Sequence, residues 1–182
     1  AELPARLRPM PWDVMVGDPT LHLGLFVHRV DDVVPGLYLL VRDPAKLGSL
    51  KRAMHARFDW STPPGCPPDL PLHMLEAGGA RRLATQLSCH QDIAGDGAFS
   101  VAMIAEYQQT LFTHGAWFYR RLFWEAGLVG QVLYLEAEAA ENVIDEGQTI
   151  ALLASRRTAP FEAEIDIVGT GRFPAQRIDY GE

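Results

Sequence analysis

The stretch "YRRLFWEAGLVGQVLYLEAEAAENVIDEG" (119–147) decides the fold, because it predicts one long helix followed by an abrupt change of character. Apolar residues lie around most of the helix circumference, which is typical of a helix buried at the centre of a domain. Gly127 and Gly130 each cost roughly 1 kcal/mol relative to alanine in a helix. We therefore expect them to allow close approach of a neighbouring helix, a cofactor ring or a partner subunit, and composition alone favours helix packing within the chain. After Ala140 the sequence becomes acidic and polar.

The rest of the chain predicts strands and helices on both sides of this helix. Turn residues at 31–36 favour a hairpin, and proline-opened or periodic segments favour helices. We expect strands at 22–30, 36–43, 72–77, 98–107, 149–157 and 161–169, and helices at 44–58, 79–91 and within 107–140, with a break at Gly115. The fold class is therefore α+β or mixed α/β, without an internal repeat.

Length, charge and cysteine content exclude several classes of protein. The 182 residues suit one domain with a substantial core. The net charge of −7 and the lack of any Lys/Arg run longer than two argue against nucleic-acid binding. No apolar run is long enough to span a membrane, and the N-terminus shows no signal-peptide pattern. The two cysteines, Cys66 and Cys89, show neither C-x-x-C spacing nor a disulfide framework, which favours a reducing, cytoplasmic location.

Two polar clusters are candidates for chemistry, and each has a simpler interpretation. "SCHQD" (88–92) places His90 and Asp92 where one strand face would present both, which is half of a metal site. Such clusters are more often loop or cap residues, so we assign no metal. His22 and His28 share a face of the first expected strand but lie about 20 Å apart. We expect these two histidines to be exposed or at the edge of the core, and no catalytic residue is assigned.

Several phrases resemble the FMN-dependent nitroreductase family, in its SagB-type branch. They are "LHLGLFVHRVDDVVPGLYLLVRDP", "PPGCPPDLPL", "SCHQDIAGDGAFSVAMIAEY" and "HGAWFYRRLFWEAGLVGQVLYLEAEAA". Together they cover residues 20–140. The resemblance implies an α+β, nitroreductase-like fold: a central, mainly antiparallel sheet flanked by helices, with 118–140 as the long buried core helix.

The same resemblance implies a function, a cofactor and a partner. Family members are flavin oxidoreductases, and FMN lies where two subunits or two tandem domains associate. A homodimer, or pairing with a second nitroreductase-like domain, is therefore expected. The family pattern "EAG-x-x-x-Q-x-LYL" falls on Glu125–Leu135. By that match Glu125, Gly127 and Gln131 are the candidate cofactor-binding residues, although Glu125 and Gln131 lie on different faces of the helix.

Two departures from the family pattern set up an alternative. The N-terminal arginine motif that grips the FMN phosphate has no counterpart, although Arg6 and Arg8 are present. "ENVIDEG" (141–147) replaces the glycine-rich flavin loop. The expected organisation is an irregular segment at 1–19, a nitroreductase-like core at 20–140 and a divergent segment at 141–182. The alternative function is a non-catalytic module for dimerisation or partner binding, possibly a truncated domain with an unrelated tail.

Overall fold

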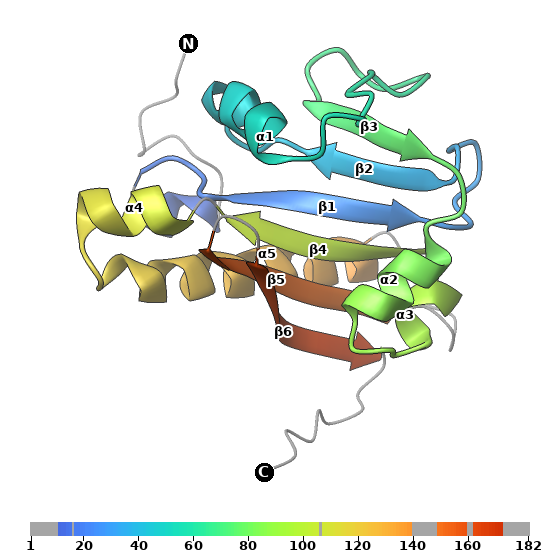
Figure 1. Ribbon diagram of the computed structural model, residues 1–182. Coiled ribbons are helices and arrows are strands. Elements are labelled where there is room, and N and C mark those ends of the chain that lie inside the picture. Colours follow the sequence, from blue (N-terminus) through green and yellow to red (C-terminus); the bar gives the residue numbers. More distant parts are fainter. Residues whose placement is uncertain (1–10, 16, 106, 140–148, 160–161, 173–182) are drawn as a thin grey trace.

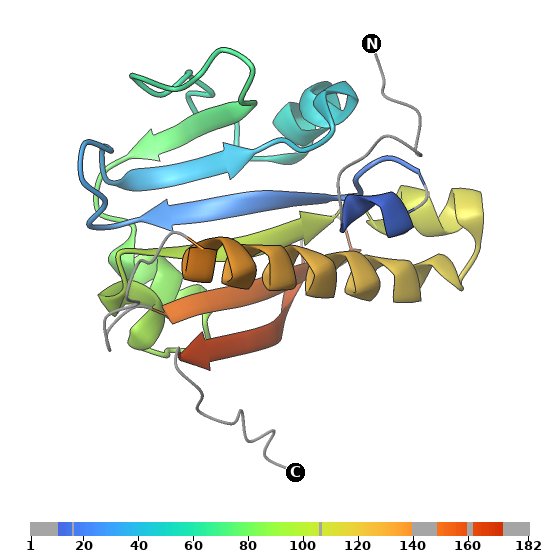
Figure 2. The same cartoon turned by 180° about the vertical axis from the view of Figure 1, so that it is seen from behind.

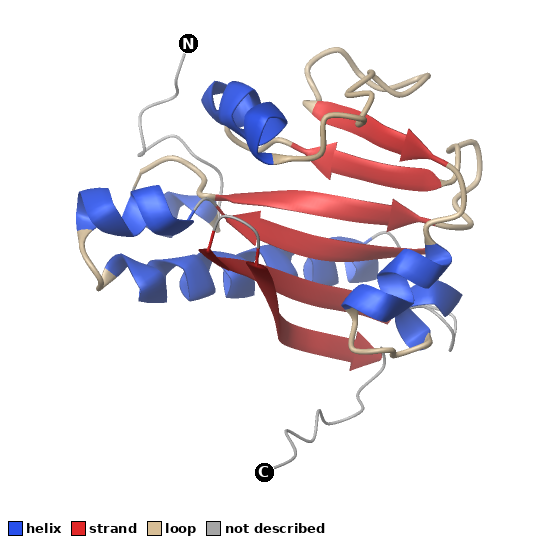
Figure 3. Cartoon of the chain, viewed as in Figure 1, coloured by secondary structure: helices blue, strands red, loops and turns tan. Residues whose placement is uncertain are grey.

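The computed structural model describes residues 11–15, 17–105, 107–139, 149–159 and 162–172, with side chains up to residue 136 (Figure 1). Its helices are η2 (Trp12–Val14), η3 (Pro44–Lys46), α1 (Leu47–Ala53), α2 (Arg81–Leu87), α3 (Ile93–Asp96), α4 (Tyr107–His114) and α5 (Phe118–Ala139). Its strands are β1 (Leu21–Val27), β2 (Gly36–Leu40), β3 (Leu72–Ala77), β4 (Phe99–Ala105), β5 (Thr149–Ala159) and β6 (Glu162–Arg172). The described chain is therefore α+β, as the sequence predicts (Figure 3).

The strands form one sheet in the order β3-β2-β1-β4-β5-β6. Neighbouring strands run antiparallel except β4 and β5, which are parallel. The predicted hairpin is confirmed, with Leu23 opposite Leu40 and Val27 opposite Gly36. Both strands expected after the long helix are present, and their backbones extend the same sheet. The Gly-Thr-Gly of residues 169–171 lies inside β6.

Helices cover both faces of the sheet. Helix α5 runs across one face (Figure 2), while α1 and the α2–α3 pair lie on the other (Figure 1). The core beneath α5 is formed by Leu21, Leu23, Val101, Met103, Ala126 and Val129. On the opposite face, one cluster lies under α2 and α3 (Phe26, Ala80, Ala84, Ala94) and another under α1 (Leu39, Val41, Leu50, Leu75). Alternate residues of β1 thus pack on opposite faces, as the pleat of a strand requires.

Two helices end earlier than their sequence periodicity suggests. The helix expected over 44–58 ends at Ala53, because the chain then turns to run beside β3, where the Ser61 carbonyl accepts from the Met74 amide at 2.8 Å. The helix expected over 79–91 ends at Leu87. The expected break at Gly115 is confirmed: its φ of +86° is a left-handed conformation that glycine adopts without steric cost.

The expectation that α5 is buried around most of its circumference is wrong for the described chain. Phe118, Leu122, Ala126 and Val129 face the sheet and are buried. The opposite side carries Trp124, 62 % exposed, and Leu135, 52 % exposed. The sheet covers one side of the helix, and no other described element covers the side that faces outward in Figure 2. The apolar residues on the outer side therefore need another explanation.

Candidate functional site

A stripe of residues runs along the exposed side of α5 at helical spacing. We call it the outer face of α5, and it consists of Arg120, Trp124, Gly127, Gln131 and Leu135, all of them exposed. The steps of three or four residues between its members place them on one side of a helix. Stripes with this spacing are typical of surfaces that pack against a second helix. An exposed tryptophan and arginine are also the residue types that dominate binding energies at protein interfaces.

Gly127 lies at the centre of the outer face and leaves room for a neighbour. A Cβ atom built at this position would meet no atom within 4 Å, apart from the neighbouring backbone of its own helix. Packing against the described residues therefore does not require a glycine at this position. Gln131, one turn further along, has an exposed side-chain amide that can both donate and accept hydrogen bonds. Two of the three predicted cofactor-binding residues therefore lie together on an accessible surface.

The third predicted residue, Glu125, lies on the opposite side of α5 and is 2 % exposed. Its carboxylate accepts hydrogen bonds from the Thr20 amide at 3.1 Å, the Leu21 amide at 3.3 Å and the Thr20 hydroxyl. It also pairs with the Arg42 guanidinium at 2.6 Å and the Arg121 guanidinium at 3.4 Å. The carboxylate oxygens are thus occupied by groups of this chain. The structure does not bring Glu125 to the surface that carries Gly127 and Gln131.

The two arginines around Glu125 are held in place by aromatic rings. The Arg42 guanidinium carbon lies 4.9 Å from the centre of the Trp12 ring, and that of Arg121 lies 4.9 Å from the centre of the Phe118 ring. Such cation–π contacts favour one orientation of the guanidinium. Sequence reasoning did not identify Thr20, Arg42 or Arg121. The spacing of four between Arg121 and Glu125 was the one local signal, since residues four apart on a helix are neighbours.

The "SCHQD" cluster forms a turn rather than a strand. Cys89 and His90 have φ values of +51° and +62°, and both are exposed. Asp92 is in the N-cap position before α3, and its side chain makes no capping hydrogen bond. This geometry fits the loop interpretation of the cluster. Within the described part of the chain, no group of three or more His, Cys, Asp or Glu residues is placed to hold a metal ion.

His22 and His28 are both buried, contrary to the expectation that they are exposed or at the core edge. The Nε2–H of His28 donates to the Ala94 carbonyl oxygen at 3.0 Å. Its Nδ1 has no hydrogen-bond partner among the described residues. Burial lowers the pKa of His28 below 6.5, the Ala94 hydrogen bond opposes that shift, and the charges of Arg81 and Arg29 add to it.

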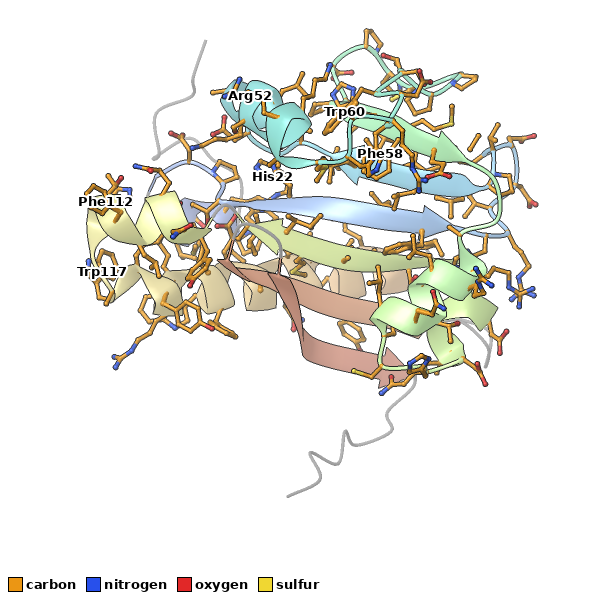
Figure 4. All side chains as sticks on the ribbon, in the orientation of Figure 1. His22, Arg52, Phe58, Trp60, Phe112 and Trp117 are labelled. Atoms are coloured by element: carbon orange, nitrogen blue, oxygen red, sulfur yellow. The ribbon has the colours of Figure 1, made fainter. Side chains whose placement is uncertain are left out.

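The large exposed aromatic residues gather at the corner between α4 and α5. Phe112 is 88 % exposed and Trp117 is 59 % exposed. Figure 4 places both at the same end of the molecule, away from the α1 side of the sheet where His22, Arg52, Phe58 and Trp60 lie. Trp117 immediately precedes α5, so this corner continues toward Trp124 on the outer face. No described helix is long and apolar enough to cross a lipid bilayer.

Comparison with protein-family models, with curated proteins and with solved structures finds no match to this chain. The geometry of the described residues is therefore the basis for functional inference, alongside the resemblance in the sequence. Of the two segments in which the family phosphate motifs were sought, 141–147 lies outside the described residues, and 1–20 is described only at 11–15 and 17–20. Gly127 and Gln131 fit a flavin in two respects. A bare glycine lets a planar ring approach the backbone, and an amide can pair with the polar edge of such a ring.

Proposed function

We propose that this chain is one half of an FMN-dependent oxidoreductase of the nitroreductase type, completed when the outer face of α5 meets a second domain. The observation that carries the proposal is the position of Gly127 at the centre of an exposed, partly apolar helix face. Within the described chain, no packing contact requires a glycine at this position. A helical glycine that costs roughly 1 kcal/mol relative to alanine is explained if something outside the chain approaches it closely.

A second copy of the chain is the partner that charge favours. From Tyr107 to Trp124 the sequence has no acidic residue, and it includes Arg120. The far end of α5 carries Glu136 and Glu138. An antiparallel pair of α5 helices crossing at Gly127 would place Arg120 near the partner's Glu136. Trp124 would lie near the partner's Gln131. Closed two-fold contacts of this kind, in which one surface patch meets itself, are the commonest symmetry of soluble oligomers.

In this assembly the chain would contribute binding surface to FMN rather than reactive groups. Gly127 would let the flavin or the partner backbone approach α5, and Gln131 would orient it by hydrogen bonding. Bound flavin supplies two-electron redox chemistry of its own, while the protein supplies position and environment. Burying the outer face between two copies would exclude water from that environment. Glu125, whose carboxylate is taken up by Thr20, Arg42 and Arg121, would act in support of the fold.

The alternative is a non-catalytic association module with the same fold. The occupied carboxylate of Glu125 favours it, because one member of the flavin-binding pattern is then explained by packing alone. In this alternative the outer face of α5 still binds a second copy, but no flavin accompanies it. The two candidate functions therefore agree on association and differ in the cofactor.

Flavin binding separates the two candidates. The full chain is titrated with FMN, and the quenching of flavin fluorescence is measured for the wild type, Gln131→Ala and Phe112→Ala. The proposal expects saturable, stoichiometric binding that Gln131→Ala weakens at least tenfold. Phe112 is the control, because its exposed ring lies outside the outer face. Unchanged flavin fluorescence at protein concentrations where the chain is dimeric would reject the oxidoreductase and leave the association module.

A further inference from the structure

The segment before β1 has no regular structure from Asp18 to Thr20, yet it is held by long-range contacts. The Thr20 amide and hydroxyl both donate to the Glu125 carboxylate, 105 residues away in sequence. The Leu21 amide, at the start of β1, donates to the same carboxylate. Arg121 reaches the Asp18 carbonyl oxygen at 3.5 Å. A single side chain of α5 thus receives hydrogen bonds from both Thr20 and Leu21.

The same carboxylate also links α5 to a residue that follows β2, the strand next to β1. Arg42 follows β2, and its guanidinium donates to both the Glu125 carboxylate, at 2.6 Å, and the Leu21 carbonyl oxygen, at 3.1 Å. Charge-assisted hydrogen bonds of this length are directional. The contact therefore holds Glu125 toward the end of β2 and the start of β1, and it resists rotation of α5 about its axis. Because Trp124 and Gly127 are fixed to the same helix, their outward direction depends on that rotation.

We propose that Glu125 is a positioning residue for the outer face of α5. It binds Thr20, Arg42 and Arg121 together, and this contact sets the rotation of the helix, so that Trp124, Gly127 and Gln131 face the partner. The inference rests on the proposed function for what the outer face binds. The positioning itself rests on the contacts of Glu125 alone. We call Glu125, Thr20, Arg42 and Arg121 the Glu125 cluster.

Amide hydrogen exchange tests the positioning directly. Exchange is measured residue by residue in the full chain for the wild type, Glu125→Gln and Glu76→Gln. Glu125→Gln removes the charge and keeps the shape, and we expect the Thr20 and Leu21 amides to exchange at least tenfold faster. The amides of Val101 and Met103, in the core strand β4, report the loss of global stability in the same variant. Glu76→Gln is the matched control, since the Arg57–Glu76 pair at 3.5 Å is largely exposed and should change neither amide.

Self-association is the second measurement. If Glu125 only fastened the segment before β1, the dimer dissociation constant would stay unchanged. The dimer dissociation constant of Glu125→Gln should rise at least tenfold, although no residue of the outer face is altered. Should Glu125→Gln fail to fold, Thr20→Val removes the hydroxyl that donates to Glu125 and accepts from Arg121 at 3.3 Å, and it should shift both readouts in the same direction by a smaller factor. Because Thr20 lies outside the outer face, a change in dimerisation in this variant can come only through the Glu125 cluster.

The outcomes separate this inference from the function on which it rests. Wild-type exchange rates at Thr20 and Leu21 in Glu125→Gln, or an unchanged dissociation constant, would overturn the positioning role. A monomeric wild-type chain would instead reject the proposed function and the association half of this inference. The exchange rates at Thr20 and Leu21 would then still test whether Glu125 fastens the segment before β1. A dissociation constant that rises only by the factor that the loss of global stability explains, measured by urea unfolding of the same variant, would also overturn the positioning role.

Discussion

The Arg42 guanidinium and the Glu125 carboxylate meet at 2.6 Å although 83 residues separate them in sequence. Arg42 is 15 % exposed and Glu125 is 2 % exposed, so the pair is shielded from solvent. Arg121 approaches the other carboxylate oxygen from one turn earlier on α5. The contact joins the end of β2, the start of β1 and the middle of the longest described helix. It therefore connects the sheet to the helix that carries the candidate functional surface.

Loss of the Glu125 charge should destabilise the fold strongly. In Glu125→Gln the buried Arg121 guanidinium and the partly buried Arg42 guanidinium lose their carboxylate. Breaking a buried ion pair from one side typically costs about 3–5 kcal/mol. Urea unfolding followed by circular dichroism should report a drop of this size in the free energy of unfolding. The same measurement on Glu76→Gln is the control, because removing a largely exposed ion pair changes stability by only about 0–1 kcal/mol. Equal, small effects in the two variants would contradict the account of the Glu125 cluster.

Replacing Gly127 should have opposite effects on folding and on association. In Gly127→Ala the free energy of unfolding of the monomer should rise by up to about 1 kcal/mol, since alanine favours the helix and its Cβ meets no neighbour. The dimer dissociation constant should rise, because the Cβ separates the two helices where they cross. Both quantities are measured by chemical denaturation and sedimentation at matched protein concentrations.

Gly115→Ala is the control for the glycine substitution. Gly115 has a φ of +86°, so a side chain there adopts a left-handed conformation that costs roughly 1–2 kcal/mol. The variant should be less stable, and its dissociation constant should stay close to the wild-type value once folded protein is compared. If Gly127→Ala were to stabilise the chain and leave association intact, close approach at Gly127 would be excluded.

A charge exchange tests the antiparallel arrangement of two copies. Arg120→Glu and Glu136→Arg should each weaken association, because either substitution puts like charges together across the two-fold contact. Exposed ion pairs contribute about 0.2–1 kcal/mol each, so the expected change in the dissociation constant is about fivefold. Combining the two substitutions should bring the dissociation constant most of the way back to the wild-type value. A double variant as weak as the worse single variant would exclude the antiparallel pairing.

His28 should make the fold less stable as the solution becomes acidic. Its pKa lies below 6.5 in the folded chain, mainly because burial disfavours the charged ring. Between the lowered pKa and 6.5 the unfolded chain binds more protons than the folded one, so stability falls as pH decreases through this window. His28→Gln should flatten this part of the pH dependence of the free energy of unfolding. An unchanged pH profile would assign the acid sensitivity to other groups.

Local patterns in the sequence predict the elements well where neighbouring residues determine them. The hairpin between β1 and β2 follows from Asp, Pro and Gly at 31–36, and the break before α5 follows from Gly115. The strands at 149–157 and 161–169 follow from composition and alternation. Helices α1 and α2 are shorter than predicted because tertiary contacts, such as Ser61 with Met74, determine where the chain leaves the helix.

The candidate site was predicted only in part, because exposure and long-range contacts are not local properties. The apolar residues of α5 correctly predict a long helix, but periodicity cannot distinguish a side covered by the same chain from one covered by a partner. Glu125 was assigned with Gly127 and Gln131 by resemblance, and the structure places it on the opposite side of the helix. Its partners Thr20 and Arg42 lie 105 and 83 residues away, beyond the reach of any spacing rule.

Sedimentation velocity of the full chain with FMN, recorded at both the protein and the visible flavin absorbance bands, tests the central claim most directly. The account predicts that flavin and protein sediment together as a dimer in the wild type. In Trp124→Ala, which removes the largest apolar side chain of the outer face, the protein should sediment as a colourless monomer. The flavin absorbance should lie at the position of the free cofactor. A wild-type chain that sediments as a monomer, with all flavin remaining at the position of the free cofactor, would contradict it.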